Sequence, residues 1–460
     1  MAISEEFLGE ISCTPRFHEK EKVRFVLVMP PTPQIPTPGR EFLLRTPVEG
    51  VTYIGSVLEN AGYSVEIVDL RPQAEISIDD ILRNGKTVIG IHTTCDSYNF
   101  LEEFTRRVKE RDKDVPIILG GPFVSSVPEV LMRNLPVDYA VMKEGELSIL
   151  ELMEALSEEK EDSIPDIGGI CYKENGKVIF TKPRTQIKNL DNLPHLNLVL
   201  WPGVKENPRV EKMGISSSRG CPMNCSFCFK AIPRVHLQSP ERFVEEVNLL
   251  MSRYSIRYCY INDLTFVMDK KRTYQICEGL KKTGLHWACS TRVDNIDKEL
   301  LKAMKDGGCE EIWYGFESVD QKVLDENFKR ITVGDIERAI ELTNNAGIKV
   351  MGNFIIGLLG ETEESLNKMV KFIETRDDVI PCSIKFLAPF PGTYVYRYAR
   401  ERGLIKDDIE YFRMLSRRKV NYAEDEIINC THLPEEKLRE AFQKIRQISY
   451  ERYGPLDWAC

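Results

Sequence analysis

The segment Ser216–Lys230 reads SSSRGCPMNCSFCFK and places cysteines at positions 221, 225 and 228. It continues a strand-like stretch at 213–218, so we expect the three thiols to lie in the loop after that strand. Thiols this close together in a chain can converge on one soft metal centre. We therefore predict that Cys221, Cys225 and Cys228 are metal ligands.

The number of these cysteines narrows the kind of metal centre. A structural zinc site is usually closed by a fourth ligand, and the nearest candidate, His236, lies beyond a proline-containing stretch. An iron–sulfur cubane held by three cysteines keeps one iron open for an outside ligand. We favour the cubane, and we leave zinc or a redox disulfide as the alternative.

The chain on the C-terminal side of this segment alternates between strand-like and helix-like patterns. Residues 211–395 contain six βα units, which predict a partial (β/α)6 barrel of the TIM type with its chemistry at the C-terminal strand ends. Residues 396–460 read as a small helical region. The expected strands lie at 213–218, 256–262, 286–291, 310–316, 348–356 and 382–388.

The chain on the N-terminal side shows a second alternation of this kind, at residues 23–157. Its first apolar run, VRFVLVM at Val23–Met29, is typical of a strand that is buried on both faces. The pattern predicts a doubly wound, flavodoxin-like parallel sheet, which binds its ligand at the carboxyl ends of the strands. The fold class is α/β. Residues 158–210 read as a linker with a hairpin at Glu174-Asn175-Gly176, and residues 1–22 as an N-terminal extension.

Composition excludes several classes of protein. The net charge of -9 argues against a nucleic-acid partner, because no basic stripe is available to neutralise phosphates. The longest apolar runs are about half the ~20 residues that a membrane span needs, so we expect no transmembrane segment. The N-terminus lacks an apolar secretory core, and most of the thirteen cysteines stand singly in apolar segments. These features predict a cytoplasmic protein.

The cysteine motif, CxxxCxΦC with the aromatic Phe227 before the third cysteine, resembles the signature of the radical S-adenosylmethionine (SAM) superfamily. The resemblance extends over roughly residues 20–400. It implies an oxygen-sensitive 4Fe-4S cluster whose open iron binds SAM, and cleavage of SAM to a 5'-deoxyadenosyl radical that abstracts hydrogen from the substrate. It also implies an electron donor such as flavodoxin or ferredoxin.

Further motifs carry the resemblance at the ends of the barrel strands, and they imply contacts to each part of SAM. An Asx turn at Asp263 and a salt bridge from Arg292 to Asp294 or Asp297 remain as structural alternatives. Asn262, Val319 and Leu359 depart from the usual pattern. The implied residues are Asn262 and Asp263 for the amine, Arg292 for the carboxylate with Ser290 on the same strand face, Glu317 and Ser318 for the ribose, and Gly357 for the adenine, with a turn-forming role of Gly357 as the alternative.

The upstream domain and its LDNLP linker resemble the cobalamin-binding branch of the same superfamily, which includes C-methyltransferases and the anaerobic magnesium-protoporphyrin cyclase. None of the six histidines has an aspartate two residues before it, so the Asp-x-His-x-x-Gly motif is absent. The glycines could instead serve only a tight βα turn. The residues implied near cobalamin are Pro31, Thr32, Arg71, Thr93, Thr94, Gly120, Gly121, Glu144 and Gly145.

These features together predict a radical SAM enzyme that uses cobalamin to methylate an unactivated carbon. A radical oxidoreductase or cyclase is the first alternative, and a non-catalytic corrinoid or cluster sensor is a remote one. The sequence leaves the substrate open among small molecules, lipids, tetrapyrroles and peptides.

Overall fold

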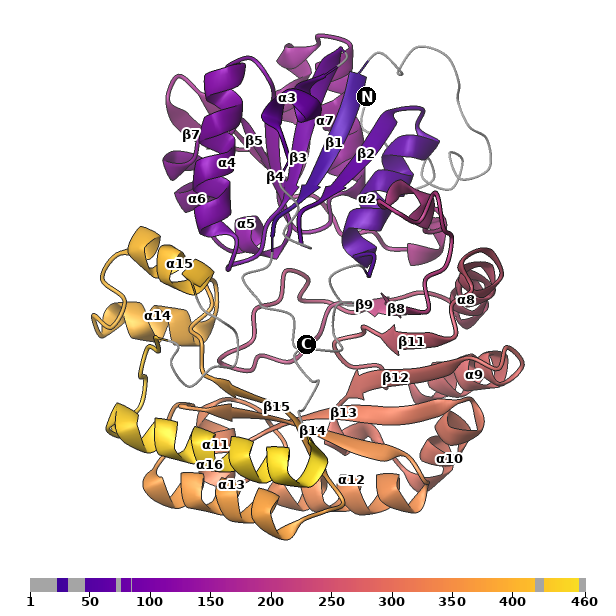
Figure 1. Ribbon diagram of the computed structural model, residues 1–460, viewed down its shortest axis with the longest axis vertical. Helices are drawn as coiled ribbons and strands as arrows, with labels where there is room; N and C mark the ends of the chain where they lie inside the picture. The colour runs from indigo at the N-terminus through magenta and orange to yellow at the C-terminus, as the bar shows by residue number, and fades with distance from the viewer. Residues whose placement is uncertain (1–22, 32–45, 72–75, 84, 418–425, 455–460) are drawn as a thin grey trace.

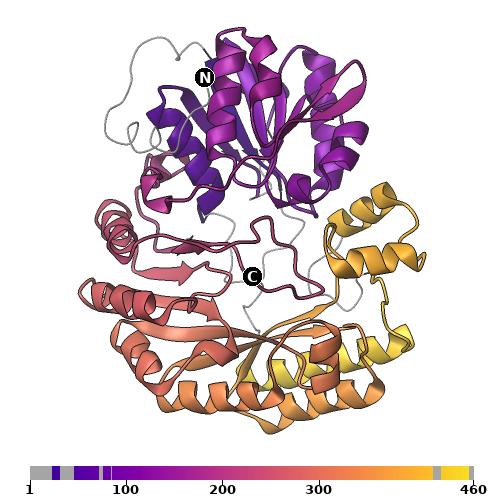
Figure 2. The same cartoon turned by 180° about the vertical axis from the view of Figure 1, so that it is seen from behind.

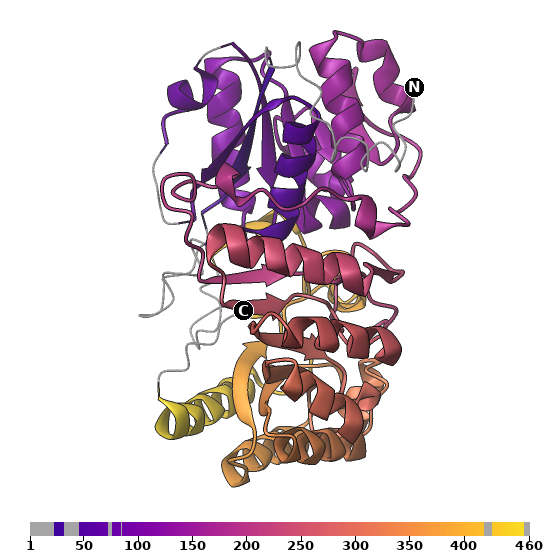
Figure 3. The same ribbon diagram turned by 90° about the vertical axis from the view of Figure 1, so that its right-hand side faces the viewer.

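The computed structural model describes residues 23–31, 46–71, 76–83, 85–417 and 426–454. Two sheets organise these residues, and they lie at opposite ends of the molecule (Figures 1 and 3). We call the first sheet and its helices the first unit, and the second sheet and its helices the second unit. Among the described residues, no helix combines the length and the apolar character needed to cross a bilayer.

The first sheet confirms the doubly wound pattern. Its strand order is β2-β1-β3-β4-β5-β6-β7, and its first five strands are parallel. Successive residues of β1 face different cores: Phe25 and Leu27 pack with α2 and α7, and Val26 and Val28 pack with α3 and α4. Both faces are therefore covered by helices, as a continuous apolar strand requires. The strands are β1 (Val23–Met29), β2 (Ser64–Asp69), β3 (Lys86–His92), β4 (Ile117–Gly120) and β5 (Tyr139–Val141).

The hairpin that the sequence placed in a linker belongs to this sheet. Strands β6 (Ile170–Glu174) and β7 (Lys177–Phe180) continue it in antiparallel register beside β5, so the sheet is mixed rather than wholly parallel. Asn175 and Gly176 both have positive φ, 49° and 75°, which matches the twist of a two-residue turn. The helices of the first unit are α2 (Glu49–Asn60), α3 (Ile78–Leu82), α4 (Tyr98–Arg111), α5 (Pro122–Ser126), α6 (Pro128–Asn134) and α7 (Glu146–Ser157).

The second sheet contains the six predicted strands, all parallel, in the order β15-β14-β13-β12-β11-β8. Among the described residues β8 and β15 do not pair with each other, so the sheet is not closed by hydrogen bonds. Its strands are β8 (Lys212–Ile215), β11 (Tyr258–Ile261), β12 (His286–Thr291), β13 (Cys309–Glu317), β14 (Lys349–Ile356) and β15 (Ile380–Phe386). Its helices are α8 (Pro240–Tyr254), α9 (Lys270–Lys281), α10 (Lys298–Asp306), α11 (Gln321–Glu326), α12 (Val333–Asn345) and α13 (Glu363–Thr375).

The C-terminal helices connect the two units. Helix α16 (Glu435–Tyr453) packs on α13 and β15, whereas α15 (Asp408–Arg417) packs on α4 of the first unit (Figure 2). Arg413 on α15 forms an ion pair with Glu102 on α4 at 2.7 Å. Helix α14 (Tyr394–Glu401) lies before α15 in the chain. A short antiparallel ribbon, β9 (Ser218–Arg219) with β10 (His236–Leu237), encloses the cysteine segment.

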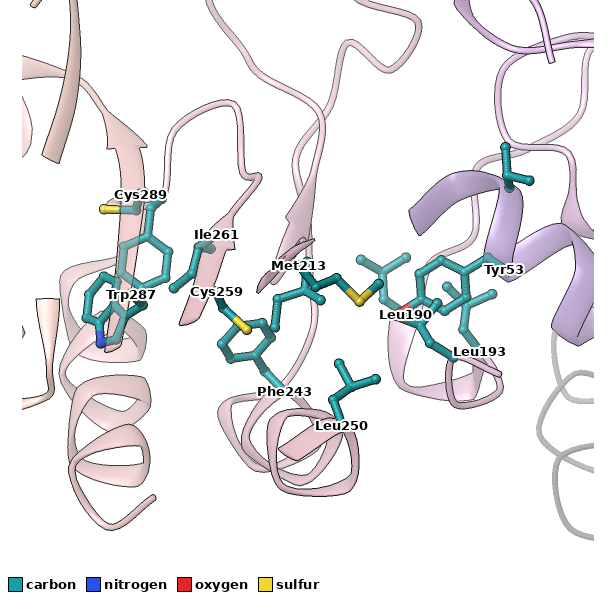
Figure 4. Close-up of a cluster of buried hydrophobic side chains, with 14 of the residues drawn as sticks. Tyr53, Leu190, Leu193, Met213, Phe243, Leu250, Cys259, Ile261, Trp287 and Cys289 are labelled. Carbon is teal, nitrogen blue, oxygen red and sulfur yellow. The ribbon is translucent and has the colours of Figure 1, made fainter. Parts of the chain in front are cut away.

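One hydrophobic core runs through both units (Figure 4). It extends from Trp287 on β12 past Met213 on β8 to Leu190 and Leu193, and it reaches Tyr53 on α2 of the first unit. Because protein cores are packed as densely as organic crystals, such a core fixes the position of one unit relative to the other.

Trp287 anchors the second-unit end of this core. Its side chain is fully buried, its indole nitrogen donates to the carbonyl of Gly307 at 2.7 Å, and its ring packs edge-on against Phe266. We expect Trp287→Ala to lower the free energy of unfolding by about 3–5 kcal/mol, because it leaves a cavity and an unpaired carbonyl. Urea denaturation followed by circular dichroism measures this effect. Tyr450→Ala, at an exposed position of α16, is the matched control and should change stability by less than about 0.5 kcal/mol; equal effects of the two variants would contradict the assignment.

Candidate functional site

A cavity of about 450 Å³ lies between two groups of residues. One group stands at the carboxyl ends of the strands of the first sheet, and the other follows β8 and β11 of the second sheet. This volume is in the range of small-molecule sites. The first unit contributes His92 and Gly120, the last residues of β3 and β4, and the segment 143–146 that follows β5. The second unit contributes residues around Arg219 and Phe229. The cavity therefore lies at the edge where a doubly wound sheet binds its ligand.

One part of the cavity extends along the face of the first sheet and is apolar. Phe25, Ile118 and Val141 line it from β1, β4 and β5, and Ile149 lines it from α7. Gly90 on β3 leaves room for the Phe25 ring, because an added Cβ would lie only 2.4 Å from its Cζ. This region suits a flat apolar group and offers it no charge.

The two glycines after β4 keep the cavity open and shape its wall. At Gly120 an added Cβ would meet no atom within 4 Å, so the missing side chain is free space for a ligand. Gly121 has φ +105°, and a Cβ there would lie 2.8 Å from the carbonyl of Thr93. The Thr93 hydroxyl donates to the carbonyl of Gly120 at 2.8 Å and accepts from the Val124 amide at 3.1 Å. Thr93 therefore holds the glycine turn in place.

The structure brings some of the residues implied near cobalamin to the cavity and not others. Gly120, Gly121, Glu144 and Gly145 line it; Pro31, Thr93 and Thr94 do not, and Thr32 is outside the described residues. Arg71 is also elsewhere: its guanidinium donates to Asp69 at 2.7 and 2.8 Å and to the carbonyl of Thr46, and it lies over the Trp201 ring. It fastens β2 to the connection between the units.

His92 lines the cavity although the sequence analysis did not select it. Burial, and then the charge of Arg71, lower the pKa of its imidazole to about 4, so the ring is neutral at pH 7. The signal that could have identified it was its position as the last residue of β3.

Buried carboxylates hold the four residues that precede the cysteine loop. Glu49 accepts from the amide and the hydroxyl of Ser216 at 2.8 and 2.5 Å. The guanidinium of Arg219 donates to Glu144 at 2.9 Å and to Glu146 at 2.6 Å, and it lies 5.3 Å from the centroid of the Tyr53 ring. Burial alone would lower the pKa of Arg219, but the two carboxylates raise it, so this arginine stays charged. The first unit thereby fixes the start of the loop.

Asp263 holds the same segment from the second unit. Its two oxygens accept from the amides of Ser217 and Ser218 at 2.6 and 2.9 Å, and from both hydroxyls at 2.7 Å. Burial raises the pKa of this carboxyl, and the hydrogen bonds from Ser217 and Ser218 lower it. The structure thus gives Asp263 four donors within the protein, and its implied contact with the SAM amine stays a prediction. Asn262, its neighbour, lines the cavity.

The cysteine loop itself is anchored at Ser226, between the second and third cysteines. Its amide and hydroxyl donate to the backbone carbonyl and side-chain oxygen of Asn327 at 3.0 and 2.7 Å, and its carbonyl accepts from the amide of Val395. Burial of the Cys228 thiol, and then the charges of Cys225 and Cys221, raise the pKa of Cys228 to about 11. Within the described ranges, no three His, Cys, Asp or Glu side chains are arranged so that they could bind one metal ion together. A cubane binds each thiolate to a different iron, and it does not require that closer arrangement.

Glu317, at the end of β13, is buried and has φ +63°. Its Oε1 accepts from the ammonium of Lys329 at 2.9 Å, and Lys329 also lies 6.0 Å from the ring centroid of Phe227 in the cysteine loop. The sequence analysis missed Lys329, because it stands in the connection after α11 rather than at a strand end. Ser318, beside Glu317, accepts from the amide of Asp320 at 3.2 Å.

Arg292 is engaged within the protein. It donates to both oxygens of Asp294, at 2.9 and 2.7 Å, and to the carbonyls of Lys329 and Arg330. This is the salt-bridge alternative that the sequence left open. Ser290 is 2.5 Å from the hydroxyl of Tyr260.

Gly357, after β14, has φ +91°, and its amide donates to the carboxylate of Glu361. Glu361 is buried, and its Oε1 has no partner among the described residues. Burial raises the pKa of Glu361 from 4.5 to about 8, against the hydrogen bonds from the backbone of Gly357 and Leu358.

The raised pKa of Glu361 predicts a pH-dependent stability. Between pH 4.5 and about 8 this group is ionised in the unfolded chain but protonated in the folded one, so rising pH destabilises the fold up to about 8. Glu361→Gln removes this pH-dependent loss of stability. The melting temperature of the variant should therefore exceed that of the wild type by a margin that grows between pH 4.5 and about 8 and stays constant above pH 8. Differential scanning calorimetry at several pH values measures the margin. A margin that is independent of pH would contradict the assignment.

Comparison with protein-family models matches residues 215–373 to the radical SAM superfamily and residues 39–153 to the B12-binding domain. An uncharacterized methyltransferase of Pyrococcus horikoshii is 32% identical over 83% of this chain and 84% of its own length. The anaerobic magnesium-protoporphyrin IX monomethyl ester cyclase of Rubrivivax gelatinosus is 28% identical over 72% of this chain and 63% of its own length.

Among solved structures, the methyltransferase TsrM from Kitasatospora setae, with cobalamin and a 4Fe-4S cluster bound, has a TM-score of 0.68 to this chain at 19% identity. The match covers 83% of this chain and 76% of that chain, and it shows a shared fold. The relationship to the Pyrococcus protein and the two family matches agree with this fold. The chain belongs to the radical SAM superfamily, and within it to the members that carry a B12-binding domain.

Proposed function

We propose that this enzyme is a cobalamin-dependent radical SAM methyltransferase that methylates an unactivated carbon. The observation that carries the proposal is the cavity, because one wall is the ligand edge of the B12-binding domain and the other leads into the cysteine loop. The relationship to a protein named as a methyltransferase supports the same activity.

The residues of the cavity and the loop fit the cofactors of this family. The open space at Gly120 and the apolar wall around Ile118 suit a large ligand pressed against backbone. Cys221, Cys225 and Cys228 stand within eight residues of one another, and they supply the thiolates that iron prefers. When bound, the cluster supplies the electron that cleaves SAM, and cobalamin carries the methyl group.

The residues of the chain have a positioning role in this chemistry. Arg219 lines the cavity, and Cys221 follows it after a single glycine, so the two cofactors would lie next to each other under this proposal. Such proximity replaces a diffusional encounter between reacting groups by a fixed geometry. We propose that Cys221, Cys225 and Cys228 hold the cluster. Glu317, which pairs with the ammonium of Lys329 at 2.9 Å, would accept hydrogen bonds from the ribose hydroxyls of SAM.

The methyltransferase activity is tested by the fate of SAM. We expect the anaerobically reconstituted enzyme to form S-adenosylhomocysteine from SAM only when cobalamin and a chemical reductant are both present, because methyl transfer passes through the cavity. Liquid chromatography with mass spectrometry measures this product and 5'-deoxyadenosine.

The control for this experiment is Cys225→Ala, which should abolish the cluster absorbance and the formation of 5'-deoxyadenosine. Sustained formation of 5'-deoxyadenosine without S-adenosylhomocysteine would contradict methyl transfer. That result would favour a radical oxidoreductase or cyclase, the activity named for the Rubrivivax relative.

The role of Glu317 has a separate test. We expect Glu317→Gln to weaken SAM binding roughly tenfold, because a charged acceptor of hydrogen bonds becomes a neutral one. Equilibrium dialysis of the reconstituted protein with SAM measures the affinity, and the cluster absorbance should be unchanged. Glu310→Gln, at the opposite end of the same strand, is the matched control. An equal affinity in the two variants would show that Glu317 does not contact SAM.

A further inference from the structure

Three carboxylates meet one arginine in the part of the cavity nearest the cysteine loop. Glu49 comes from the start of α2, Glu144 and Glu146 come from the segment that enters α7, and Arg219 comes from β9. All four line the cavity. We call these four residues the acidic corner.

The acidic corner contains more negative than positive charge. Arg219 binds one oxygen of Glu144 and one of Glu146, whereas Glu49, among the described residues, accepts from the neutral groups of Ser216. The lysine of the loop, Lys230, donates to the carbonyl of Cys221 and the side chain of Asn224. Lys143, the remaining cation on the cavity wall, is exposed.

The pKa values of the corner reflect this excess. Burial raises the pKa of Glu49 to about 7, against the hydrogen bonds from Ser216. Burial and then the charge of Glu146 raise the pKa of Glu144. Carboxylates with raised pKa values indicate a site that is short of hydrogen-bond donors or positive charge.

One carboxylate oxygen in the corner lacks a partner. Glu146 is only 4% exposed, and its Oε1 accepts from Arg219. Its Oε2 is buried and has no hydrogen-bond partner in the described part of the chain. A buried acceptor without a donor costs about 1–3 kcal/mol. A ligand that brings an N–H group into this corner would remove that cost.

We propose that the acidic corner recognises the primary amide side chains at the rim of the corrin ring, an inference that rests on the proposed function. The corner would reject corrinoids that carry a carboxylate in place of one of these amides. An amide donates N–H groups to Glu146 and Glu49, whereas a carboxylate is repelled by both. The apolar wall around Phe25 and Ile118 cannot make this distinction, because it offers neither charge nor polar groups. The corner thus selects amidated cobalamin over its hydrolysed forms.

The wild-type enzyme provides the first test, with cyanocobalamin and its b-, d- and e-monocarboxylic acids as probes. Isothermal titration calorimetry with the reconstituted full chain measures each affinity. We expect at least one of the acids to bind about 100-fold more weakly than cyanocobalamin, because a buried like-charge contact costs several kcal/mol. Equal affinity for all the probes would overturn the inference. If cyanocobalamin itself does not bind, the proposed function fails instead.

The variant Glu146→Gln identifies the residue. A glutamine can keep an oxygen on Arg219 and places an NH2 group where Oε2 lies, so it exchanges an acceptor for a donor. We expect cyanocobalamin to bind roughly tenfold more weakly to this variant, and the rejected acid to approach the affinity of cyanocobalamin. Glu151→Gln is the matched control, because Glu151 is also buried on α7 but pairs with Arg184 outside the cavity. If both Glu146→Gln and Glu49→Gln still bind the acid much more weakly than cyanocobalamin, the inference is overturned.

Discussion

The buried guanidinium of Arg219 is the constraint on which the arrangement of the two units depends. A charged group inside a protein must be paired, and the partners of Arg219 are two carboxylates from the first unit. Because Arg219 stands one glycine before Cys221, this pairing sets the start of the cysteine loop. The position of the loop is therefore determined by the B12-binding domain as much as by the strand that leads into it.

A buried ion pair is a weak source of stability, because the cost of desolvation offsets most of the attraction. The rigidity of the interface comes instead from the shared hydrophobic core, which runs from Trp287 to Tyr53. Burial of the core contributes most of the free energy that holds the two units together, but it does not depend on orientation. The ion pairs contribute little free energy, but their hydrogen-bond geometry fixes how the two units are oriented. Tyr53 joins the two, because it belongs to the core and lies beneath the guanidinium of Arg219.

The sequence predicted the fold well, because both sheets are built from apolar strands that alternate with amphipathic helices and this pattern is local. The hairpin β6–β7 was identified by its turn residues, but its attachment to β5 was not, since strand pairing depends on contacts distant in the chain. The cysteines were selected by their spacing alone. Asp263 and Arg292 were selected by position at strand ends, yet whether a charged side chain faces a ligand or a protein partner depends on neighbours that a single sequence does not reveal.

The same limit explains why the acidic side chains of the cavity were predicted only in part. Glu144 was selected from a motif, whereas Glu49 lies far away in the sequence, at the start of a helix where a glutamate is an ordinary residue. Only the folded chain shows that this helix N-terminus faces Ser216 and that three carboxylates gather around one cation, which binds two of them. A site with too few donors is maintained in a folded protein only if a ligand supplies the missing ones, or if the carboxylates take up protons. The raised pKa of Glu49, close to neutrality, means that the two outcomes compete at physiological pH, so binding of a donor ligand should be coupled to release of a proton.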